Sequence, residues 1–359
     1  MPVTRLPVER FLELSREHPI LDVRSPGEYA HAHIPSAHSL PLFTDEERKQ
    51  VGTSYKQVSR EQAIKIGLDY FGPKMRAMVE EVEGLTTGAN KVSEEAKTVL
   101  VHCWRGGMRS GAVAWLLDLY GFRVYLLDGG YKAFRQWVLA QFLKDYNFRL
   151  IGGYTGSGKT LVLHELGNRG HAIIDLEGIA KHKGSAFGGL DDIEQPSSEM
   201  FENMVALQLQ QLTAHDPEKA IWIEDESQRI GDLNMPIELW NRFREKPLYF
   251  LDVPFEQRLN YILSDYGKYT TEGLLNAIIR IKKRLGGLET KTAVNCLLEN
   301  DRKGCFEILL KYYDKHYTKA LQNRPQLNDV ICQVPAEDVH AKNNAQKILN
   351  KVHEGTTIR

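Results

Sequence analysis

The sequence predicts two α/β domains with parallel sheets and, after them, a mainly helical C-terminal portion. Three observations predict this fold class. Short β-branched segments alternate with segments of helical periodicity, a glycine-rich loop follows one predicted strand in each half, and the strand pattern fades after residue 255. We therefore expect an N-terminal domain over 1–140, a second α/β domain over 141–255, and a helical portion over 256–359 that completes the second domain.

Two strand–helix units mark the end of the N-terminal domain. A β-branched strand at 98–103 precedes a helix at 110–121, and a second strand at 122–130 precedes a helix at 131–146. Residues 148–153 then begin a new strand, loop and helix. Because the connections between these segments are short, we expect each sheet to be parallel, with helices on its faces.

The second half continues this alternation before it becomes helical. We expect strands at 172–177, 220–225 and 247–253, with a helix at 198–215. Three later segments have helical periodicity: 256–263, 273–287 and 305–321. The C-terminal portion is therefore predicted to consist mainly of helices.

The composition excludes several classes of protein. Hydrophobic residues make up 42% and charged residues 26% of the chain, which excludes global disorder and is typical of a globular protein. No apolar run reaches the ~18 residues of a membrane span, and the N-terminus lacks the apolar core of a secretory signal, so we expect a cytoplasmic protein. The net charge of −1 argues against a surface that binds polyanions throughout, and the 4 scattered cysteines argue against a disulfide framework.

The first candidate site is a cysteine between a predicted buried strand and a predicted helix. Cys103 is followed by a Gly-Gly turn and by two arginines, Arg105 and Arg109. Such a loop directs backbone N–H groups and the positive end of a helix toward the sulfur, which lowers the pKa of the thiol and makes it nucleophilic. The arginines add positive charge that can bind an oxyanion. The remaining candidate residues of this loop are Gly106, Gly107 and Ser110.

Residues 1–140 resemble a rhodanese domain. The segment LDVRSPGEYAHAHIPSAHSLPL at 21–42 and the segment GFRVYLLDGGYKAF at 121–134 are similar to that family's signatures. The resemblance implies that Cys103 carries sulfur or selenium. In many rhodaneses the loop arginine lies five residues after the cysteine, whereas Arg109 lies six residues after Cys103. Four residues of the signature are interpreted as structural rather than catalytic: Asp22, Arg24, Glu28 and His33.

Two other interpretations of the cysteine loop stay open. The spacing also fits the Cys-x5-Arg-Ser loop of protein tyrosine phosphatases, although we find no well-placed aspartate to protonate a leaving oxygen. Alternatively, Cys103 could be a small buried hydrophobic residue, but such a residue would need neither the glycines nor the arginines.

The second candidate site is a phosphate loop. Residues 153–160 match the GxxxxGKT pattern directly after a predicted strand and before a predicted helix, which is the context that this motif requires. In such a loop, backbone N–H groups bind a phosphate, Lys159 reaches the outer phosphate and Thr160 could bind Mg²⁺. The predicted phosphate-binding residues are Gly153, Gly156, Ser157, Gly158, Lys159 and Thr160. Whether a metal is required is not predicted.

Carboxylates at the end of a neighbouring strand are expected to act with the phosphate loop. The segment AIWIEDES offers three candidates, Glu224, Asp225 and Glu226, without indicating which one faces the loop. Arg258 is either a second phosphate ligand or part of a surface salt bridge.

Basic residues cluster on the predicted helix at 273–287. Ile278, Ile281, Leu285 and Leu288 are expected on one apolar stripe. Four cations surround this stripe and form a candidate contact for the phosphate backbone of a nucleic acid: Arg280, Lys282, Lys283 and Arg284. A second candidate at 309–321 interleaves lysines with tyrosines that could stack on bases, and a charged insertion at 43–67 could face a partner.

Together the two domains resemble the tRNA 2-selenouridine synthase family, and the resemblance includes the segments TDEERKQVGTSYKQ and WIEDESQRIG. It implies that the enzyme replaces sulfur by selenium in wobble 2-thiouridine of the tRNA anticodon arm. The family uses geranyl diphosphate to alkylate the sulfur and then selenophosphate to supply selenium. We expect no tightly bound cofactor. By this resemblance the phosphate loop holds the diphosphate. Cys103 accepts selenium as a perselenide, and Arg105 and Arg109 bind the released phosphate.

Two rival functions remain. The first is an ATP-using thiotransferase or kinase fused to a sulfur-carrier rhodanese domain. The second is a relay protein that passes persulfide sulfur to another protein without catalysing a reaction on a nucleic acid.

Overall fold

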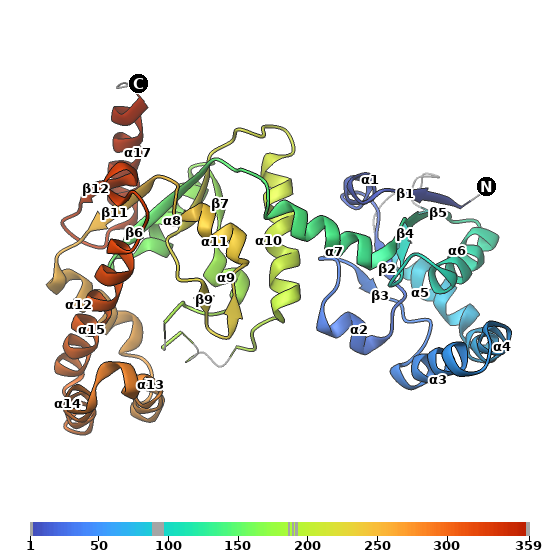
Figure 1. Cartoon of the computed structure of the whole chain (residues 1–359), viewed down its shortest axis with the longest axis horizontal. Helices are drawn as coiled ribbons and strands as arrows, with labels where there is room; N and C mark the ends of the chain where they lie inside the picture. The colour runs from blue at the N-terminus through green and yellow to red at the C-terminus, as the bar shows by residue number, and fades with distance from the viewer. Residues whose placement is uncertain (1–2, 88–96, 186, 189, 191–192, 357–359) are drawn as a thin grey trace. The chain divides into compact units, whose positions relative to one another are not determined.

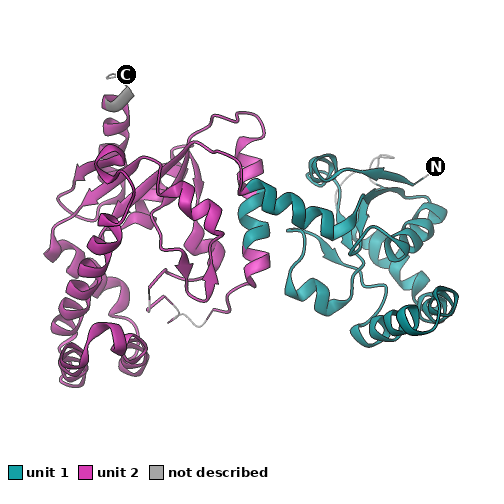
Figure 2. Cartoon of the chain, viewed as in Figure 1, with its two compact units in different colours: residues 1–141, 202–207 teal, residues 142–201, 208–359 magenta. Residues whose placement is uncertain are grey.

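The computed structural model describes residues 3–87, 97–185, 187–188, 190 and 193–356. The chain forms two compact units, which Figure 2 shows in different colours. Unit 1 contains residues 1–141 and 202–207, and unit 2 contains residues 142–201 and 208–359. None of the helices in the described ranges is long and apolar enough to span a bilayer.

Unit 1 is a parallel five-stranded sheet in the order β1-β5-β4-β2-β3 (Figure 1). Its strands are β1 (Thr4–Leu6), β2 (Ile20–Asp22), β3 (His38–Ser39), β4 (Thr98–His102) and β5 (Arg123–Leu127). The helices are α1 (Val8–Leu14), α2 (Pro26–His31), α3 (Asp45–Gln57), α4 (Arg60–Phe71), α5 (Met75–Thr87), α6 (Met108–Tyr120) and α7 (Gly130–Gln141), with a 3-10 turn η1 at Gly72–Lys74.

The sequence of β4 explains its central place in this sheet. All five of its residues are buried, as expected for a parallel strand that is covered on both faces. Val99 and Val101 pack in one core with Val113 and Leu117 of α6. Strand β4 ends at His102, so the cysteine loop begins at the carboxyl edge of the sheet, where parallel α/β folds place their ligands.

Unit 2 contains a second parallel sheet, in the order β12-β11-β6-β8-β7. Its strands are β6 (Phe148–Gly153), β7 (Ala172–Ile174), β8 (Ile221–Glu224), β11 (Leu248–Asp252) and β12 (Ile331–Pro335), and a small hairpin joins β9 (Arg229–Ile230) to β10 (Leu233–Asn234). The helices are α8 (Lys159–Asn168), α9 (Leu176–Ala180), α10 (Ser198–Thr213), α11 (Ile237–Phe243), α12 (Phe255–Tyr266), α13 (Thr271–Leu285), α14 (Gly287–Leu298), α15 (Arg302–Gln322), α16 (Leu327–Val330) and α17 (Ala341–Thr356).

The helices α12 to α15 enclose a separate apolar core that includes Leu259, Ile278 and Leu309. The same C-terminal portion also contains a strand that the sequence analysis did not predict. Strand β12 pairs in parallel with β11 and forms the edge of the sheet. Its signal is weak because only Val334 of its five residues is buried and because the strand ends in a proline.

Three local expectations are wrong. The strand predicted at 172–177 ends at Ile174, because Asp175 caps helix α9 and residues 176 and 177 belong to that helix. The helix predicted at 131–146 ends at Gln141. Leu288 does not continue the apolar stripe of α13, because Gly286 takes φ 104° and ends the helix, and Leu288 is 75% exposed on the next helix.

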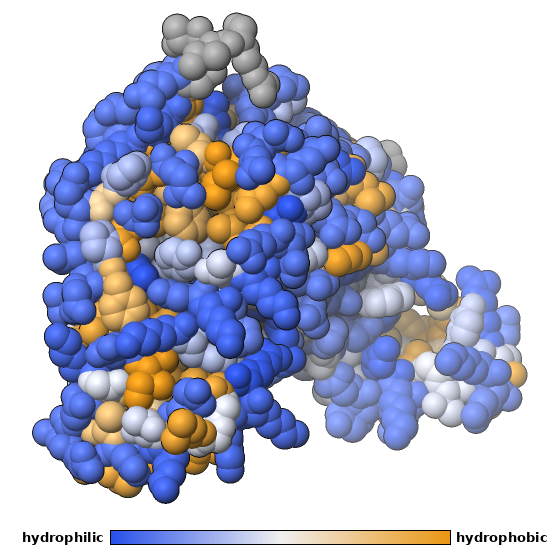
Figure 3. All heavy atoms as spheres, turned by 60° about the vertical axis from the view of Figure 1, so that its left-hand side comes forward, coloured by the Kyte–Doolittle hydropathy of each residue, from blue (hydrophilic) through white to orange (hydrophobic). Residues whose placement is uncertain are grey.

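Figure 3 shows a largely hydrophilic face of the molecule on which hydrophobic side chains gather in separate patches.

Candidate active sites

The cysteine loop, residues 103–110, connects β4 to α6. The Cys103 side chain is only 3% exposed, and its Sγ lies 3.2 Å from the Ser110 hydroxyl oxygen. Burial raises the pKa of the Cys103 thiol. Hydrogen bonds from Ser110 and from the Arg105 backbone N–H, together with the positive charge of Arg109, lower this pKa below its ordinary value. The sequence analysis predicts this direction of the shift, which makes the thiol easier to ionise.

Two glycines in left-handed conformations allow this loop to pack closely. Gly106 has φ 64°, and a Cβ there would lie 2.7 Å from the Leu127 carbonyl oxygen. Gly130, at the start of α7, has φ 62°, and a Cβ there would lie 2.4 Å from both the Cys103 carbonyl oxygen and the Gly106 nitrogen. The Tyr131 N–H also donates to the Cys103 carbonyl at 2.8 Å. The segment after β5 thus fixes the cysteine loop, a role for Gly130 that the sequence analysis missed.

The two loop arginines have different surroundings. Arg109 donates from Nη1 to Glu28 Oε2 at 2.8 Å, and Arg48 approaches the same carboxylate at 2.9 Å. Glu28 also accepts hydrogen bonds from Ser25 in the capping box of α2. Glu28 therefore orients Arg109, which agrees with the structural role predicted for it. Arg105 lies in the loop itself, where its backbone N–H faces the thiol.

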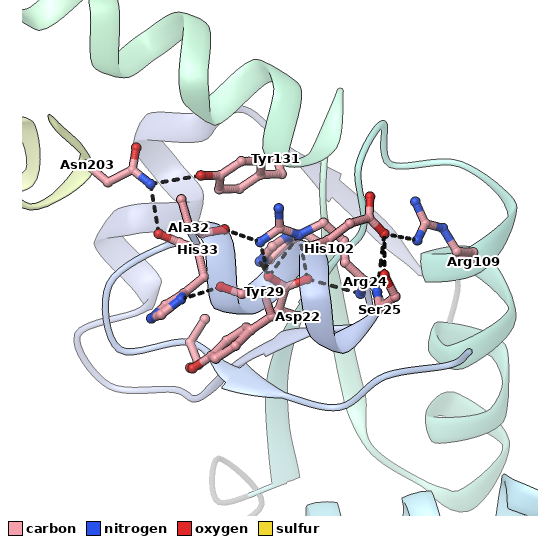
Figure 4. Close-up of polar contacts among 12 residues, drawn as sticks. Asp22, Arg24, Ser25, Tyr29, Ala32, His33, His102, Arg109, Tyr131 and Asn203 are labelled. Carbon is pink, nitrogen blue, oxygen red and sulfur yellow. Dashed lines mark hydrogen bonds and ion pairs between the residues drawn. The ribbon is translucent and has the colours of Figure 1, made fainter. Parts of the chain in front are cut away.

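A buried charged network lies beside β4 (Figure 4). Asp22 and Arg24 form a fully buried ion pair with contacts of 2.5–3.0 Å, and the Arg24 guanidinium stacks 3.8 Å above the Tyr131 ring. Burial lowers the pKa of His102 to about 4 despite Asp22 at 3.7 Å, so His102 is neutral at pH 7. Asn203 of α10 donates to the Tyr131 hydroxyl at 2.9 Å. This network is structural, and His102 does not supply positive charge to the thiol.

The phosphate loop, residues 153–160, connects β6 to α8. Gly153, Gly156 and Gly158 all have positive φ angles, of 149°, 81° and 74°. A Cβ on Gly153 would lie 2.5 Å from Ser157 Oγ, which is itself buried and has no hydrogen-bond partner among the described residues. An unpaired buried hydroxyl inside such a loop is positioned to bind a phosphate oxygen.

Lys159 of this loop is surrounded by carboxylates. Burial alone would lower the pKa of Lys159, but Glu226, Glu224 and Glu177 raise it above its ordinary value. The Thr160 hydroxyl hydrogen-bonds to Glu224, which is 2% exposed. Within the part of the chain that the structure describes, one Glu224 carboxylate oxygen has no hydrogen-bond partner. Two of the three predicted acids, Glu224 and Glu226, therefore face the loop.

Glu177 is a member of this acidic group that the sequence analysis missed. It lies on the short helix α9, directly after β7. A Cβ on Gly184 would lie 2.5 Å from Glu177 Oε1 and 2.8 Å from Glu226 Oε2, so both carboxylates lie close to Gly184 and to each other. Burial, with Glu226 and Glu224 nearby, raises the pKa of Glu177 to about 9, and burial raises that of Glu226 to about 7. The only sequence signal for Glu177 is its position shortly after a parallel strand.

The third predicted acid, Asp225, has a supporting role. It accepts a hydrogen bond from the Tyr317 hydroxyl at 2.9 Å and pairs with Arg324 at 3.1 Å. The Tyr317 hydroxyl also accepts from the Gly153 N–H at 3.3 Å. Tyr317 was expected to stack on bases, but in the structure it braces the phosphate loop from α15.

Arg258 is not part of a surface salt bridge, because its side chain is buried. It is 4% exposed and makes a two-pronged ion pair with Asp314, with both contacts at 2.8 Å. It also donates to the Thr155 carbonyl at 3.1 Å. Arg258 therefore holds the backbone of the phosphate loop.

The predicted basic surface lies on one side of α13. Ile278, Ile281 and Leu285 are buried, whereas the four cations are exposed. We call these four residues the α13 basic face: Arg280, Lys282, Lys283 and Arg284. Tyr312 and Tyr313 of α15 pack partly buried against the helical core, so they are poorly placed to stack on bases.

Comparison with known proteins gives a consistent result. A family model described as the tRNA 2-selenouridine synthase AAA domain matches residues 146–348, and a model of the rhodanese-like domain matches residues 8–136. These matches confirm the predicted fold class. A tRNA 2-selenouridine synthase from Hydrogenovibrio crunogenus is 37% identical over 288 residues, which cover 75% of this chain and 76% of the relative. One from Pseudomonas putida is 34% identical over 332 residues, covering 83% and 88%. A third, from Nitrosomonas europaea, is 32% identical over 293 residues, covering 80% and 73%.

Proposed function

The chain belongs to the tRNA 2-selenouridine synthase family, and we propose that it replaces sulfur by selenium in wobble 2-thiouridine of tRNA in the cytoplasm. The exchange would have two steps, S-geranylation with geranyl diphosphate and selenation with selenophosphate. One observation carries this proposal: the chain combines a strand-to-helix loop that lowers the pKa of the Cys103 thiol with a phosphate loop whose Lys159 lies among carboxylates. Each loop suits one of the two steps.

We assign the first step to the phosphate loop. The thiocarbonyl sulfur of the base would attack the first carbon of the geranyl chain, so that a C–S bond forms as the C–O bond to diphosphate breaks. Negative charge then grows on the departing diphosphate. Lys159, the Ser157 hydroxyl and the loop N–H groups are positioned to stabilise this charge.

Mg²⁺ would fit the same loop. Among the described residues no group of three or more His, Cys, Asp or Glu side chains is arranged to hold a metal. However, Thr160 and the unpaired oxygen of Glu224 offer the two oxygen ligands that Mg²⁺ commonly takes from a protein when substrate phosphates supply others. Bound Mg²⁺ would neutralise part of the diphosphate charge.

We assign the second step to the cysteine loop. The Cys103 thiolate would attack selenium, so that an S–Se bond forms as the Se–P bond breaks, with Arg105 and Arg109 binding the phosphorus anion. The perselenide would then attack carbon 2 of the base and expel geranyl thiol, after which an added thiol reduces the Se–S bond and frees the selenocarbonyl. If selenophosphate itself attacked carbon 2 of the base, no thiol would be needed to free the selenocarbonyl, and hydrolysis of the Se–P bond would release phosphate. Transfer of selenium to Cys103 instead leaves the electron pair of the Se–P bond on phosphorus, so that phosphite is released.

Two variants test the assignment of the steps. Cys103→Ala should still geranylate tRNA but fail to install selenium, because a missing nucleophile has no substitute. Lys159→Ala should lose geranylation, whereas selenation of tRNA that already carries the S-geranyl group should persist. Cys332→Ala is the matched control, because Cys332 lies in β12. Mass spectrometry of digested tRNA distinguishes the products.

The outcomes of these assays separate the alternatives. Selenation by Cys103→Ala at the parent rate, with phosphate as the phosphorus product, would overturn the carrier role. Normal geranylation by Lys159→Ala would overturn the role of the phosphate loop.

The phosphate loop also suits an ATP-using transferase, and a binding experiment separates the two functions. A ligand that binds only the folded chain raises its melting temperature. We expect a larger rise with geranyl diphosphate than with ATP in the parent, and little rise in Lys159→Ala. A large rise with ATP and none with geranyl diphosphate would favour the ATP-using enzyme.

A further inference from the structure

A cavity of about 770 Å³ lies in unit 1. It lies among α3, α4 and the first turns of α6, and α3 and α4 pack against each other (Figure 1). These two helices are formed mainly by the charged insertion at 43–67, for which the sequence analysis predicted only an unspecified partner.

The interior of this cavity is apolar. Phe43 and Phe71 are buried and line it. Ile64, Leu68 and Met108 also line it but remain 39%, 57% and 52% exposed. Clefts of roughly 300–1,000 Å³ with apolar walls are typical of small-molecule sites. The exposed apolar side chains indicate that a ligand with a hydrocarbon part would gain from binding there.

The charged residues of the cavity are all cationic. Arg48, Lys49, Lys56, Arg105 and Arg109 are among its lining residues, and the described lining contains neither aspartate nor glutamate. Because Arg48 and Arg109 also pair with Glu28, most of the positive charge offered to a ligand comes from Lys49, Lys56 and Arg105. An apolar interior with a cationic lining suits a ligand that joins a hydrocarbon chain to a polyanion. A wholly apolar peptide or a lipid tail alone would not need these cations.

The cavity adjoins the cysteine loop. Arg105 and Arg109 belong to both, and Met108 and Ala112 of α6 line the cavity next to them. The same helix carries Ser110, whose hydroxyl lies 3.2 Å from Cys103 Sγ. A ligand in the cavity would therefore lie next to the loop that we assign to selenium delivery.

We propose that this cavity binds the geranyl chain of S-geranylated tRNA during selenation, an inference that rests on the proposed function. The cationic lining would receive the nucleic-acid phosphates, and the chain would lie along Ile64, Leu68 and Met108. When a selenium nucleophile attacks carbon 2, a C–Se bond forms and the C–S bond breaks, with its electron pair leaving on sulfur. The geranyl thiolate then takes up a proton from solvent, and its hydrocarbon part stays in the cavity until release.

The experiment compares two substrates in the selenation step. The double variant Ile64→Ser, Leu68→Ser removes apolar surface at exposed positions, and Val58→Ser is the matched control because Val58 is 71% exposed but does not line the cavity. We expect KM for S-geranyl tRNA to rise about 10- to 100-fold in the double variant, as is usual when apolar contacts in a pocket are lost. KM for S-methyl tRNA, geranylation activity and the melting temperature should stay at parent values.

Each outcome bears on one claim. If the parent selenates neither S-alkylated tRNA, the proposed function fails. If the parent selenates S-geranyl tRNA and the double variant keeps the parent KM, the cavity assignment alone is overturned. If the double variant instead loses geranylation, the cavity holds the free diphosphate donor, which also overturns the assignment. Thermal titration of Cys103→Ala with the S-geranyl-2-thiouridine nucleoside gives a second reading, because a bound chain should raise the melting temperature unless Ile64 and Leu68 are changed.

Discussion

Removing the Ser110 hydroxyl should raise the pKa of Cys103 by about one unit. The Ser110 oxygen lies 3.2 Å from the sulfur, and Cys103 is 3% exposed, so little water can replace the lost hydrogen bond in Ser110→Ala. A hydrogen bond to a charged group contributes about 1.5–3 kcal/mol. One pKa unit corresponds to about 1.36 kcal/mol, so the range is about one to two units. Sulfur is a weak acceptor, and we therefore expect the lower end.

The pKa can be measured from the pH dependence of alkylation by iodoacetamide, after subtraction of the rate in Cys103→Ala. The other cysteines should contribute little, because burial raises the pKa values of Cys296, Cys305 and Cys332. Ser54→Ala is the matched control, since Ser54 is also buried but its hydroxyl has no hydrogen-bond partner in the described ranges. A midpoint in Ser110→Ala equal to that of the parent would refute the claim that this hydroxyl stabilises the thiolate.

Three further predictions concern the loops and the α13 basic face. Gly130→Ala should destabilise unit 1 by about 1–3 kcal/mol and slow alkylation of Cys103, because the added Cβ would overlap the cysteine loop. Denaturant titrations measure the loss of stability. The control Gly111→Ala, where a Cβ meets nothing within 4 Å, should be neutral or stabilising. Changing all four residues of the α13 basic face to Gln should weaken tRNA binding and reduce its salt dependence by about four counterions at most; an unchanged salt slope would remove this face from the tRNA site. Glu177 and Glu226 have pKa values of about 9 and 7, above those of the unfolded chain, so the free energy of unfolding should fall as pH rises from about 5 to 9. Glu177→Gln should reduce this fall, and equal slopes in chemical denaturation would contradict the raised pKa.

The sequence predicts those parts of the sites that local chain geometry dictates. Cys103 and Lys159 each lie between a strand and a helix, and a glycine-rich turn at that point produces an anion-binding loop in almost any parallel sheet. The parallel sheets follow for the same reason, because β-branched strands alternate with helices over short connections.

The supporting residues could not be predicted, because they come from segments far away in the sequence. Gly130 contacts the cysteine loop only through the pairing of β4 with β5. Tyr317 and Asp225 meet only because α15 packs against the sheet of unit 2, and nothing in the repeat of lysines and tyrosines indicates this. Strand β12 is recognised only by its partner β11, because an edge strand with one buried residue has little pattern of its own.

The support of the phosphate loop by the C-terminal portion has a consequence for how this enzyme can evolve or be recombined. Asp314 holds Arg258, Tyr317 reaches the Gly153 N–H, and a Cβ on Gly158 would lie 2.4 Å from the Val339 side chain. Consider a chimera in which the segment 141–255 comes from a relative, whereas α15 and residue 339 come from this chain. Its phosphate loop and its C-terminal portion would have evolved in different proteins, so their contacts would not match. Residues of the loop and of the C-terminal portion should therefore be inherited as one block, and productive crossovers should fall outside both.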